Sequence, residues 1–238
     1  MYSSPQLDIA LNGENPRTET DVLVDSLPKH IAIAGLIGAG KTTLANNIGT
    51  HIGTFVGHKQ VVIHYENVKT KLLSMFYGDM KEWGFALQCA LLNQRHKQQQ
   101  QIAWNNKRYN IEDRFMDEDH IFATVLWKQG NMDMHKLEVY QEMVLTYERH
   151  VKRPDLIIFL DVSAEVSMER IKQRGREMES KIPLEYLQAL EQEYKLFIKE
   201  ISKKIPVIRV TWEEFQEPWV IAPLIVDRWN TKCFNLTE

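Results

Sequence analysis

Residues 30–48 read HIAIAGLIGAGKTTLANNI, and this stretch gives the strongest indication of the fold. Residues 35–42 form a complete G-x-x-x-x-G-K-T pattern, between the apolar run 31–34 and a segment with a helical pattern. Glycines let the backbone curl around phosphate oxygens, and the following helix directs its positive N-terminal end at the same anion. The sequence therefore predicts a strand, a loop and a helix that together bind a nucleoside triphosphate.

The side chains of this loop have separate predicted tasks. Lys41 is expected to reach the β- and γ-phosphates, and the Thr42 hydroxyl to be a ligand of Mg²⁺. A chance match in a glycine-rich turn is the alternative, and the flanking strand and helix patterns argue against it. The predicted ATP-binding residues of the loop are Gly35, Gly38, Ala39, Gly40, Lys41, Thr42 and Thr43.

Length and composition indicate a single globular α/β domain. The chain has 238 residues, 44% hydrophobic content and a net charge of −3, which argues against a general nucleic-acid coat. Two cysteines far apart in the sequence form no disulfide or metal framework and favour a reducing, cytoplasmic location. No apolar run approaches the roughly 18 to 20 residues that a membrane span needs. We expect residues 1–28 to be a flexible acidic tail and residues 29–238 to be the folded domain.

Strand-like and helix-like segments alternate along the chain, which predicts a parallel sheet covered by helices on both faces. The five strand candidates are residues 31–34, 61–65, 108–111, 155–161 and 207–210. The carboxyl ends of such strands form the rim where ligands bind. Glu66 follows the second run and is a candidate general base, although capping of the next helix is an equal alternative at this point.

The third run leads to Glu112, Asp113 and Arg114 at the same rim. A carboxylate there can hold hydrated Mg²⁺, and an arginine can neutralise the oxygens of a transferring phosphoryl group. A surface ion pair is the alternative. In the helical segment 81–106, Gln88 and Arg95 are seven residues apart and share one face, which could read the edge of a base. Periodicity alone favours a solvated face for them.

A local cluster of basic residues follows the fourth strand candidate. It comprises Arg170, Lys172, Arg174 and Arg176 in a chain that is slightly acidic overall. Such a cluster suggests a polyphosphate partner, whereas most charge runs are solvated faces.

Taken together, these motifs resemble the deoxynucleoside kinases, the group that includes deoxycytidine, deoxyguanosine and deoxyadenosine kinases. The resemblance covers residues 30 to about 210. It rests on GLIGAGKTT at 35–43, Glu66, WGFALQ at 83–88, EDR at 112–114, IFA at 121–123 and RIKQRGREMESKIPLEYL at 170–187. It implies a three-layer P-loop kinase fold with a five-stranded parallel sheet and an arginine-rich lid.

The resemblance also implies roles for individual residues. Glu66 would take the proton of the nucleoside 5′-hydroxyl, beside the rim arginine Arg114. Glu179 would hold the deoxyribose 3′-hydroxyl together with Tyr77. The lid arginines that clamp the donor phosphates would be Arg170, Arg174 and Arg176.

The resemblance reverses the interpretation of Gln88 and Arg95 that periodicity alone favours. It implies that Gln88 pairs with the base, and that Arg95 and Asp119 form the arginine–aspartate pair found in kinases that accept purines or cytosine. Polar groups in such a pocket discriminate well, because an unmatched base leaves them buried and unpaired.

The chain departs from the family pattern at Ala34, Asn67, Lys71 and Phe115. The spacing from Arg114 to Phe122 is also one residue short, so either Glu112 or Asp113 could face the metal. These departures leave the reaction class intact and bear on the choice of base.

The sequence thus predicts transfer of the γ-phosphoryl of ATP, with Mg²⁺, to the 5′-hydroxyl of a deoxyribonucleoside in nucleotide salvage, with a purine deoxynucleoside or deoxycytidine favoured. A nucleoside monophosphate kinase such as thymidylate kinase is the first alternative, and Glu66 disfavours it because an acceptor phosphate needs cations. A non-catalytic nucleotide-binding subunit is the second, and the intact Lys41, Thr42, Glu66 and Arg114 argue against it. The expected partners are ATP and a deoxynucleoside, with no nucleic acid polymer and no membrane. A homodimer is expected from the family.

Overall fold

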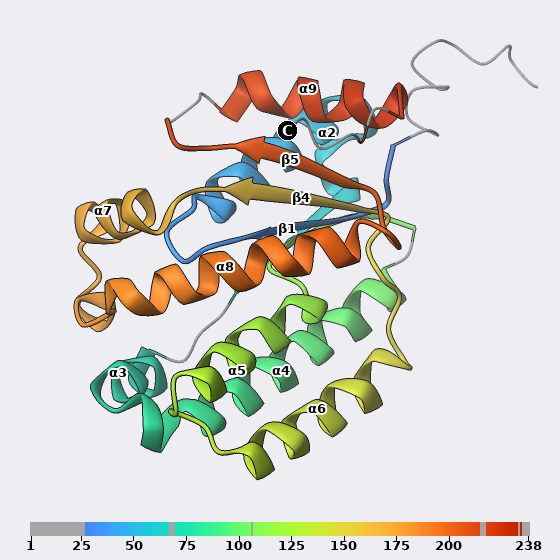
Figure 1. Cartoon of the computed structure of the whole chain (residues 1–238). Coiled ribbons are helices and arrows are strands. Elements are labelled where there is room, and N and C mark those ends of the chain that lie inside the picture. The colour runs from blue at the N-terminus through green and yellow to red at the C-terminus, as the bar shows by residue number, and fades with distance from the viewer. Residues whose placement is uncertain (1–26, 67–69, 106, 215–217, 233, 235–238) are drawn as a thin grey trace, which may run out of the picture.

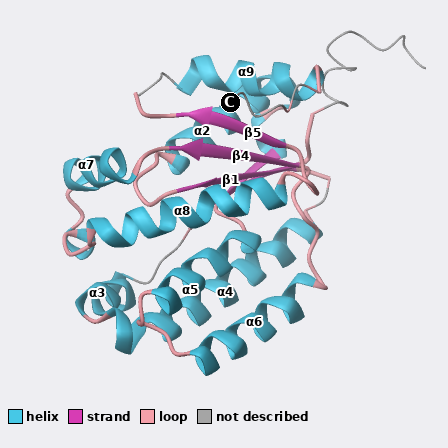
Figure 2. Cartoon of the chain, in the orientation of Figure 1, coloured by secondary structure: helices cyan, strands magenta, loops and turns pink. Residues whose placement is uncertain are grey.

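The computed structural model describes residues 27–66, 70–105, 107–214, 218–232 and 234. Five parallel strands form one sheet in the order β2-β3-β1-β4-β5, which confirms the predicted α/β architecture. Figure 2 shows β1, β4 and β5 of this sheet in magenta, with helices on both sides. The strands are β1 His30–Gly35, β2 Val61–His64, β3 Tyr109–Asp113, β4 Leu156–Asp161 and β5 Val207–Thr211.

Helices cover both faces of the sheet, which makes three layers (Figure 1). Helices α2 and α9 pack together on one face, and α4, α5 and α8 cover the other, with α6 outside α4 and α5. The α-helices are α2 Lys41–Val56, α3 Thr70–Gly78, α4 Met80–Trp104, α5 Asp119–Lys128, α6 Met134–Glu148, α7 Ala164–Arg174, α8 Leu184–Ile201 and α9 Pro218–Asn230. Single turns of 3₁₀-helix are η1 His58–Gln60, η2 Met116–Glu118 and η3 Glu177–Glu179.

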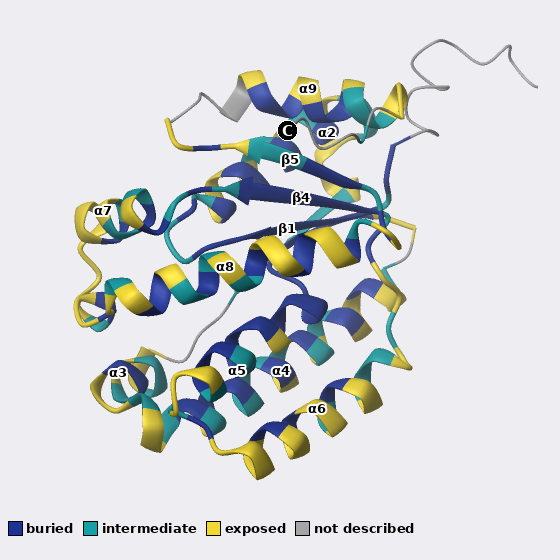
Figure 3. Ribbon diagram, in the orientation of Figure 1, coloured by how far each residue is buried: buried dark blue, intermediate teal, exposed yellow. Residues whose placement is uncertain are grey.

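The central strand β1 positions the functional residues. All six of its residues are buried, and it is bonded to β3 on one side and β4 on the other. Figure 3 shows the strands β1 and β4 dark blue along their lengths, as expected where a parallel sheet is covered on both faces. Ile33 pairs with both Asp113 and Ile158, so the carboxyl ends of the three central strands meet beside the glycine loop.

Local signals explain several helix boundaries. The Asp79 side chain accepts from the backbone N–H of Glu82 at the start of α4. Ser163 caps α7, since its hydroxyl accepts from the N–H of Val166, and Gly175 ends α7 in the left-handed conformation. Such caps satisfy backbone groups that a helix end leaves unpaired.

Some predictions differ from the structure or lie outside it. The third strand extends two residues further than predicted, through Glu112 and Asp113. Most of the predicted tail, residues 1–26, and the departure at Asn67 lie outside the described residues. Within the described part of the chain, no helix is long and apolar enough to cross a membrane.

Candidate active site

A cavity of about 770 Å³ lies at the carboxyl ends of β1 and β3. At this place the strand order changes direction, because β2 lies on one side of β1 and β4 lies on the other. Open α/β sheets place their ligand sites at such a switch point. Its walls come from the glycine loop, α3, α4 and the segment around α7 and η3. Fifteen of the predicted residues line it: Gly38, Gly40, Lys41, Thr42, Thr43, Glu66, Tyr77, Gln88, Arg95, Asp113, Arg114, Arg170, Arg174, Arg176 and Glu179.

The glycine loop needs its glycines for two different reasons. Gly38 and Gly40 have φ angles of 84° and 94°, in the left-handed region that side chains disfavour. A Cβ on Gly38 would also lie 2.8 Å from the Ile171 side chain and 2.9 Å from the Ser167 carbonyl oxygen. The Ser167 hydroxyl in turn donates to the Ile37 carbonyl, so α7 is packed directly on the loop.

Lys41 lies inside the loop, almost fully buried. Its ammonium donates to the carbonyl oxygens of Gly35 at 3.1 Å and Leu36 at 2.6 Å. Burial, together with the nearby charge of Arg114, lowers the pKa of Lys41 to about 8. The lysine is therefore a buried cation at the floor of the cavity, close to the loop amides.

Asp113 and Glu112 lie on opposite faces of β3, because successive residues of a strand point in opposite directions. The Thr42 hydroxyl donates to Asp113 Oδ2, so this pair borders the cavity. Glu112 is fully buried on the other face, where its carboxylate lies 2.7 Å from His30 Nε2 and accepts from Gln99 Nε2 at 2.8 Å. The expectation that both carboxylates reach the rim is wrong for Glu112, because β3 includes both residues and the alternation of faces turns Glu112 away from Thr42.

The Thr42 and Asp113 pair fits a magnesium ion by its chemistry. Hydroxyl and carboxylate oxygens are the ligands that Mg²⁺ prefers, and Mg²⁺ is often bound by one or two carboxylates together with substrate phosphates. Among the described residues no group of three or more His, Cys, Asp or Glu side chains forms a self-contained metal site. A metal at this position would therefore depend on the phosphates for its remaining ligands.

Glu66 follows β2 and is held between two arginines. Its Oε1 accepts from Arg95 Nη2 at 2.5 Å, and its Oε2 accepts from Arg114 Nε at 3.2 Å. Burial alone would raise the pKa of the Glu66 carboxyl, but Arg114, Arg95 and Lys41 hold it below its ordinary value. Glu66 is thus an ionised carboxylate at neutral pH, facing the cavity.

Arg114 is buried and has a backbone φ of 72°, which is unusual for a residue other than glycine. Its N–H donates to the Ile33 carbonyl oxygen at 3.1 Å, which fixes the turn that follows β3. Its Nη1 donates to the Tyr194 hydroxyl at 2.6 Å, and its Cζ lies 4.9 Å from the centre of the Phe122 ring. The alternative of a surface ion pair for this segment is wrong, because these side chains are buried.

Gln88 and Arg95 share one face of α4 and line the cavity, so the alternative of a solvated face is also wrong. Gln88 is 1% exposed, and its Oε1 has no hydrogen-bond partner among the described residues. Arg95 Nη1 forms an ion pair with the fully buried Asp119 at the start of α5. The α4 side of the cavity thus offers the unpaired amide oxygen of Gln88 beside the guanidinium of Arg95, which is paired with Asp119.

The predicted lid arginines have two different environments. Arg174 and Arg176 both form ion pairs with Glu179, which is buried in η3. Arg170 instead donates to the Trp212 carbonyl oxygen at 2.6 Å and lies 3.5 Å from that of Ala39. The three side chains therefore connect the cavity to η3 and to the segment after β5.

Tyr77 closes the cavity on the side of α3, near η3. Burial and the neighbouring Tyr186 and Glu179 raise the pKa of its hydroxyl well above the ordinary value, so the hydroxyl stays protonated. Tyr77 and Glu179 come from segments a hundred residues apart and border the same space.

Sequence reasoning missed Tyr194 and Glu118, which contact Arg114 from behind. Tyr194 has the spacing of an ordinary core residue of α8, and Glu118 belongs to an acid-rich helix start. No local signal distinguishes either residue from its neighbours. Trp212, also missed, is fully buried, and its Nε1 would lie 3.3 Å from a Cβ on Gly40.

Comparisons with known proteins agree on one family. The family model described as deoxynucleoside kinase matches residues 31–233. A deoxyadenosine kinase of Dictyostelium discoideum is 44% identical over 206 residues, which cover 86% of this chain and 81% of that protein. A deoxyguanosine kinase of Bacillus subtilis (strain 168) is 30% identical over 187 residues, covering 76% and 83% of the two chains.

Solved structures show the same similarity. The structure of deoxyadenosine kinase from M. mycoides with bound dCTP has a TM-score of 0.72 and 29% sequence identity, covering 84% of this chain and 98% of that one. A structure of deoxyadenosine kinase from M. mycoides with bound dATP has the same TM-score and coverage at 30% identity.

Proposed function

The chain belongs to the deoxynucleoside kinase family, and on that premise we propose that its preferred acceptors are purine deoxynucleosides, with deoxyadenosine first. It is an ATP-dependent kinase that transfers the γ-phosphoryl group to the 5′-hydroxyl of a deoxyribonucleoside. Family membership decides against the monophosphate kinase and the non-catalytic subunit that the sequence left as alternatives.

One observation carries the assignment of roles: the ionised Glu66 carboxylate faces the same cavity as the phosphate loop and Arg114. We assign Glu66 to the 5′-hydroxyl, which it orients by accepting a hydrogen bond. Because the transition state of phosphoryl transfer is loose, the hydroxyl proton leaves late and a weakly basic carboxylate is sufficient to receive it. Arg114 then neutralises charge on the transferring oxygens.

The donor triphosphate is assigned to the loop. Successive N–H groups of residues 35–43 and the N-terminus of α2 face the phosphates, and Lys41 exchanges its carbonyl contacts for the β- and γ-oxygens. Arg170, Arg174 and Arg176 are assigned to the same phosphates from the opposite side. When bound at Thr42 and Asp113, Mg²⁺ would supply further neutralisation of phosphate charge.

The base is assigned to α4. A glutamine amide can pair with both the amino group and a ring nitrogen of adenine, since it has one acceptor and one donor side by side. Gln88 has this acceptor unpaired inside the cavity. Arg95 lies two turns further along α4 and would contact the same base edge, with Asp119 holding its guanidinium from outside the cavity lining.

The sugar is assigned to Tyr77 and Glu179, which border the same cavity as Glu66. A protonated tyrosine hydroxyl and a carboxylate together can donate to and accept from a 3′-hydroxyl. We further propose that the domain spans residues 29–238, acts in the cytoplasm and functions as a homodimer.

The decisive experiment measures transfer from labelled ATP with Mg²⁺ to deoxyadenosine, deoxyguanosine, deoxycytidine, thymidine and thymidine monophosphate. We expect the highest kcat/KM with deoxyadenosine. Product from thymidine alone would refute the roles of Gln88 and Arg95 in base choice. Product from the monophosphate alone would refute the role of Glu66.

The variant Glu66→Gln tests the hydroxyl assignment directly. It keeps the size of the side chain but removes the charge, so kcat should fall about 100- to 10,000-fold. ATP binding, measured by calorimetry, should change little. Glu142→Gln, an exposed glutamate on α6, is the matched control and should behave as wild type. Equal losses in both variants, or lost ATP binding in Glu66→Gln, would contradict the assignment.

A further inference from the structure

We propose that Tyr194 is a positioning residue that holds the Arg114 guanidinium in its working orientation, through a buried hydrogen-bonded chain that ends at Glu118. This inference deepens the proposed function, since it rests on the assignment of Arg114 to the transferring phosphoryl group. Tyr194 itself does not line the cavity, so it acts through Arg114.

The chain consists of two short hydrogen bonds. Arg114 Nη1 donates to the Tyr194 hydroxyl at 2.6 Å, and that hydroxyl donates to Glu118 Oε2 at 2.8 Å. Glu118 Oε1 in turn accepts from the N–H of Phe115 at 3.3 Å. Tyr194 is 1% exposed and Glu118 is fully buried, so water does not compete for these groups.

The hydroxyl suits this place because it serves as acceptor and donor at once. Burial raises the pKa of Tyr194 well above its ordinary value, so the hydroxyl keeps its proton. Its ring is fixed by contacts with Phe122, at 6.2 Å between centroids, and Phe159, at 6.0 Å. A fixed ring gives the guanidinium a fixed partner.

Arg114 needs such a partner because several rotatable bonds separate its guanidinium from the backbone. Its Nε contacts Glu66, its Nη1 contacts Tyr194, and one face of the guanidinium lies over Phe122. Within the described residues Nη2 has no hydrogen-bond partner, which leaves it available for a phosphoryl oxygen. Loss of the Tyr194 contact would leave Nη1 with only its 3.7 Å ion pair to Glu118, so the guanidinium would be held more loosely.

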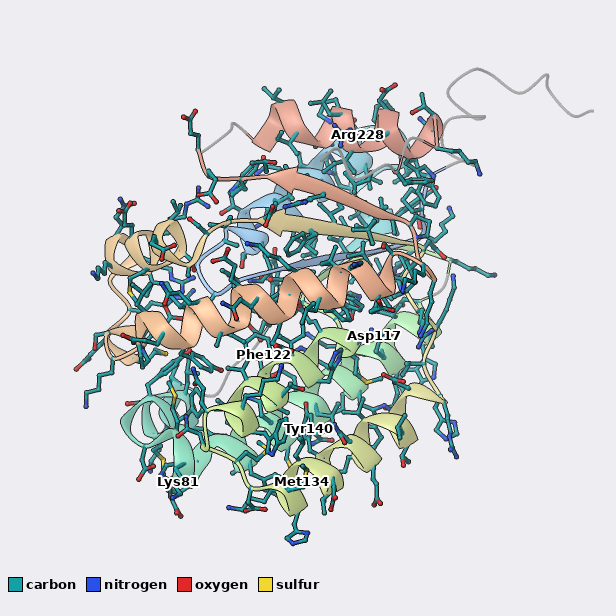
Figure 4. All side chains as sticks on the ribbon, viewed as in Figure 1. Lys81, Asp117, Phe122, Met134, Tyr140 and Arg228 are labelled. Carbon is teal, nitrogen blue, oxygen red and sulfur yellow. The ribbon has the colours of Figure 1, made fainter. Side chains whose placement is uncertain are left out.

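Tyr194 reaches Arg114 through the packing of α8 against α5, which begins directly after Glu118. Figure 4 labels Phe122 on α5 in the region between α5 and α8, and Tyr140 on α6 farther from it. Tyr140 is also fully buried, but its hydroxyl has no hydrogen-bond partner among the described residues. It therefore provides a matched control for removal of a buried tyrosine hydroxyl.

The test is Tyr194→Phe, which removes one oxygen and keeps the ring. We expect kcat to fall about 10- to 100-fold, because a small misplacement of a charged group in the transition state has effects of this size. The KM values for ATP and the deoxynucleoside should stay within about twofold, since these substrates bind without the transition-state contact. Tyr140→Phe should leave kcat and both KM values unchanged.

A double-mutant cycle separates positioning from a general loss of structure. In an Arg114→Lys background, which keeps the charge but lacks the guanidinium, Tyr194→Phe should lower kcat by less than about twofold more. A full additional loss in that background would overturn the proposal. So would an unchanged kcat in the single variant, or a rise in KM that accounts for the loss.

The cycle is run with whichever deoxynucleoside the wild-type protein phosphorylates best. A wrong assignment of base preference therefore leaves this test intact. If Glu66→Gln keeps full turnover while Tyr194→Phe loses it, the hydroxyl assignment fails and the positioning role stands. If Glu66→Gln loses turnover and Tyr194→Phe does not, the positioning role fails alone.

Discussion

The two halves of the cavity are built on opposite plans. The donor half is centred on one contiguous segment, residues 35–43, which offers mainly backbone groups and is joined by side chains from elsewhere, among them the lid arginines. The acceptor half consists of side chains from several separate elements, and Glu66, Arg95, Arg114 and Asp119 form an ion-paired network within it. The loop of the donor half is therefore sensitive to added bulk at its glycines as well as to the loss of its charged side chains. An acceptor site of this kind tolerates modest backbone change but not the loss of one partner.

Asp113 and Glu112 offer the largest expected contrast, because one of these neighbouring carboxylates borders the donor half and the other faces away from the cavity. Asp113→Asn should lower kcat about 100-fold or more, since it removes the carboxylate that, beside the Thr42 hydroxyl, would hold the Mg²⁺ that neutralises phosphate charge. Glu112→Gln should leave kcat within a few-fold and reduce the free energy of unfolding by about 1–3 kcal/mol, because its buried partners His30 and Gln99 lose a carboxylate. Steady-state kinetics and urea unfolding of both variants check this contrast, and an exchange of the two phenotypes would refute it.

Gln88 tests whether the acceptor half can be changed without disturbing the donor half. Gln88→Leu should raise the KM of the deoxynucleoside about 10- to 100-fold, because it removes two hydrogen bonds to the base at similar volume. The KM of ATP should stay near the wild-type value. Gln101→Leu, at an exposed position of the same helix, is the control. Equal changes in both KM values would show that the two halves are not independent.

Lys41 should give the donor half a pH dependence, because its side chain titrates near neutral pH. Because its pKa is lowered from 10.5 to about 8, the free protein holds it charged below pH 8 and neutral above. The kcat/KM for ATP should therefore decline above pH 8 by about tenfold per unit, as this ratio reports the free enzyme. In Lys41→Arg, which stays charged, the rate should be lower but flat with pH. A flat wild-type profile up to pH 9.5 would contradict the expectation.

Gly38 gives the smallest expected effect and tests the sensitivity of the donor half to bulk. Gly38→Ala should lower the free energy of unfolding by about 1–3 kcal/mol, because φ is +84° and the new Cβ would contact Ile171 and Ser167. Gly78→Ala, at a helical position with nothing within 4 Å, should be neutral or slightly stabilising. Thermal unfolding of the two variants checks the difference, and equal midpoints would refute the close packing of α7 on the loop.

Several parts of the site depend on local spacing and could be predicted from the sequence. The order of glycines, Lys41 and Thr42 specifies the loop, since these residues act within one turn of the chain. The five apolar runs specify parallel strands, and their ends place Glu66, Asp113 and Arg114 near one rim. The family motifs predicted the type of reaction, because they combine features spread over most of the chain.

The side of the sheet that each rim residue faces, and the distant group that it contacts, depended on tertiary packing. Two further residues of β3 were enough to turn Glu112 away from the cavity and toward Gln99, a partner on α4. The contact of Arg114 with Tyr194 joins residues 80 positions apart. Such contacts depend on how α5 and α8 pack over the sheet, and no spacing within a single segment encodes that packing.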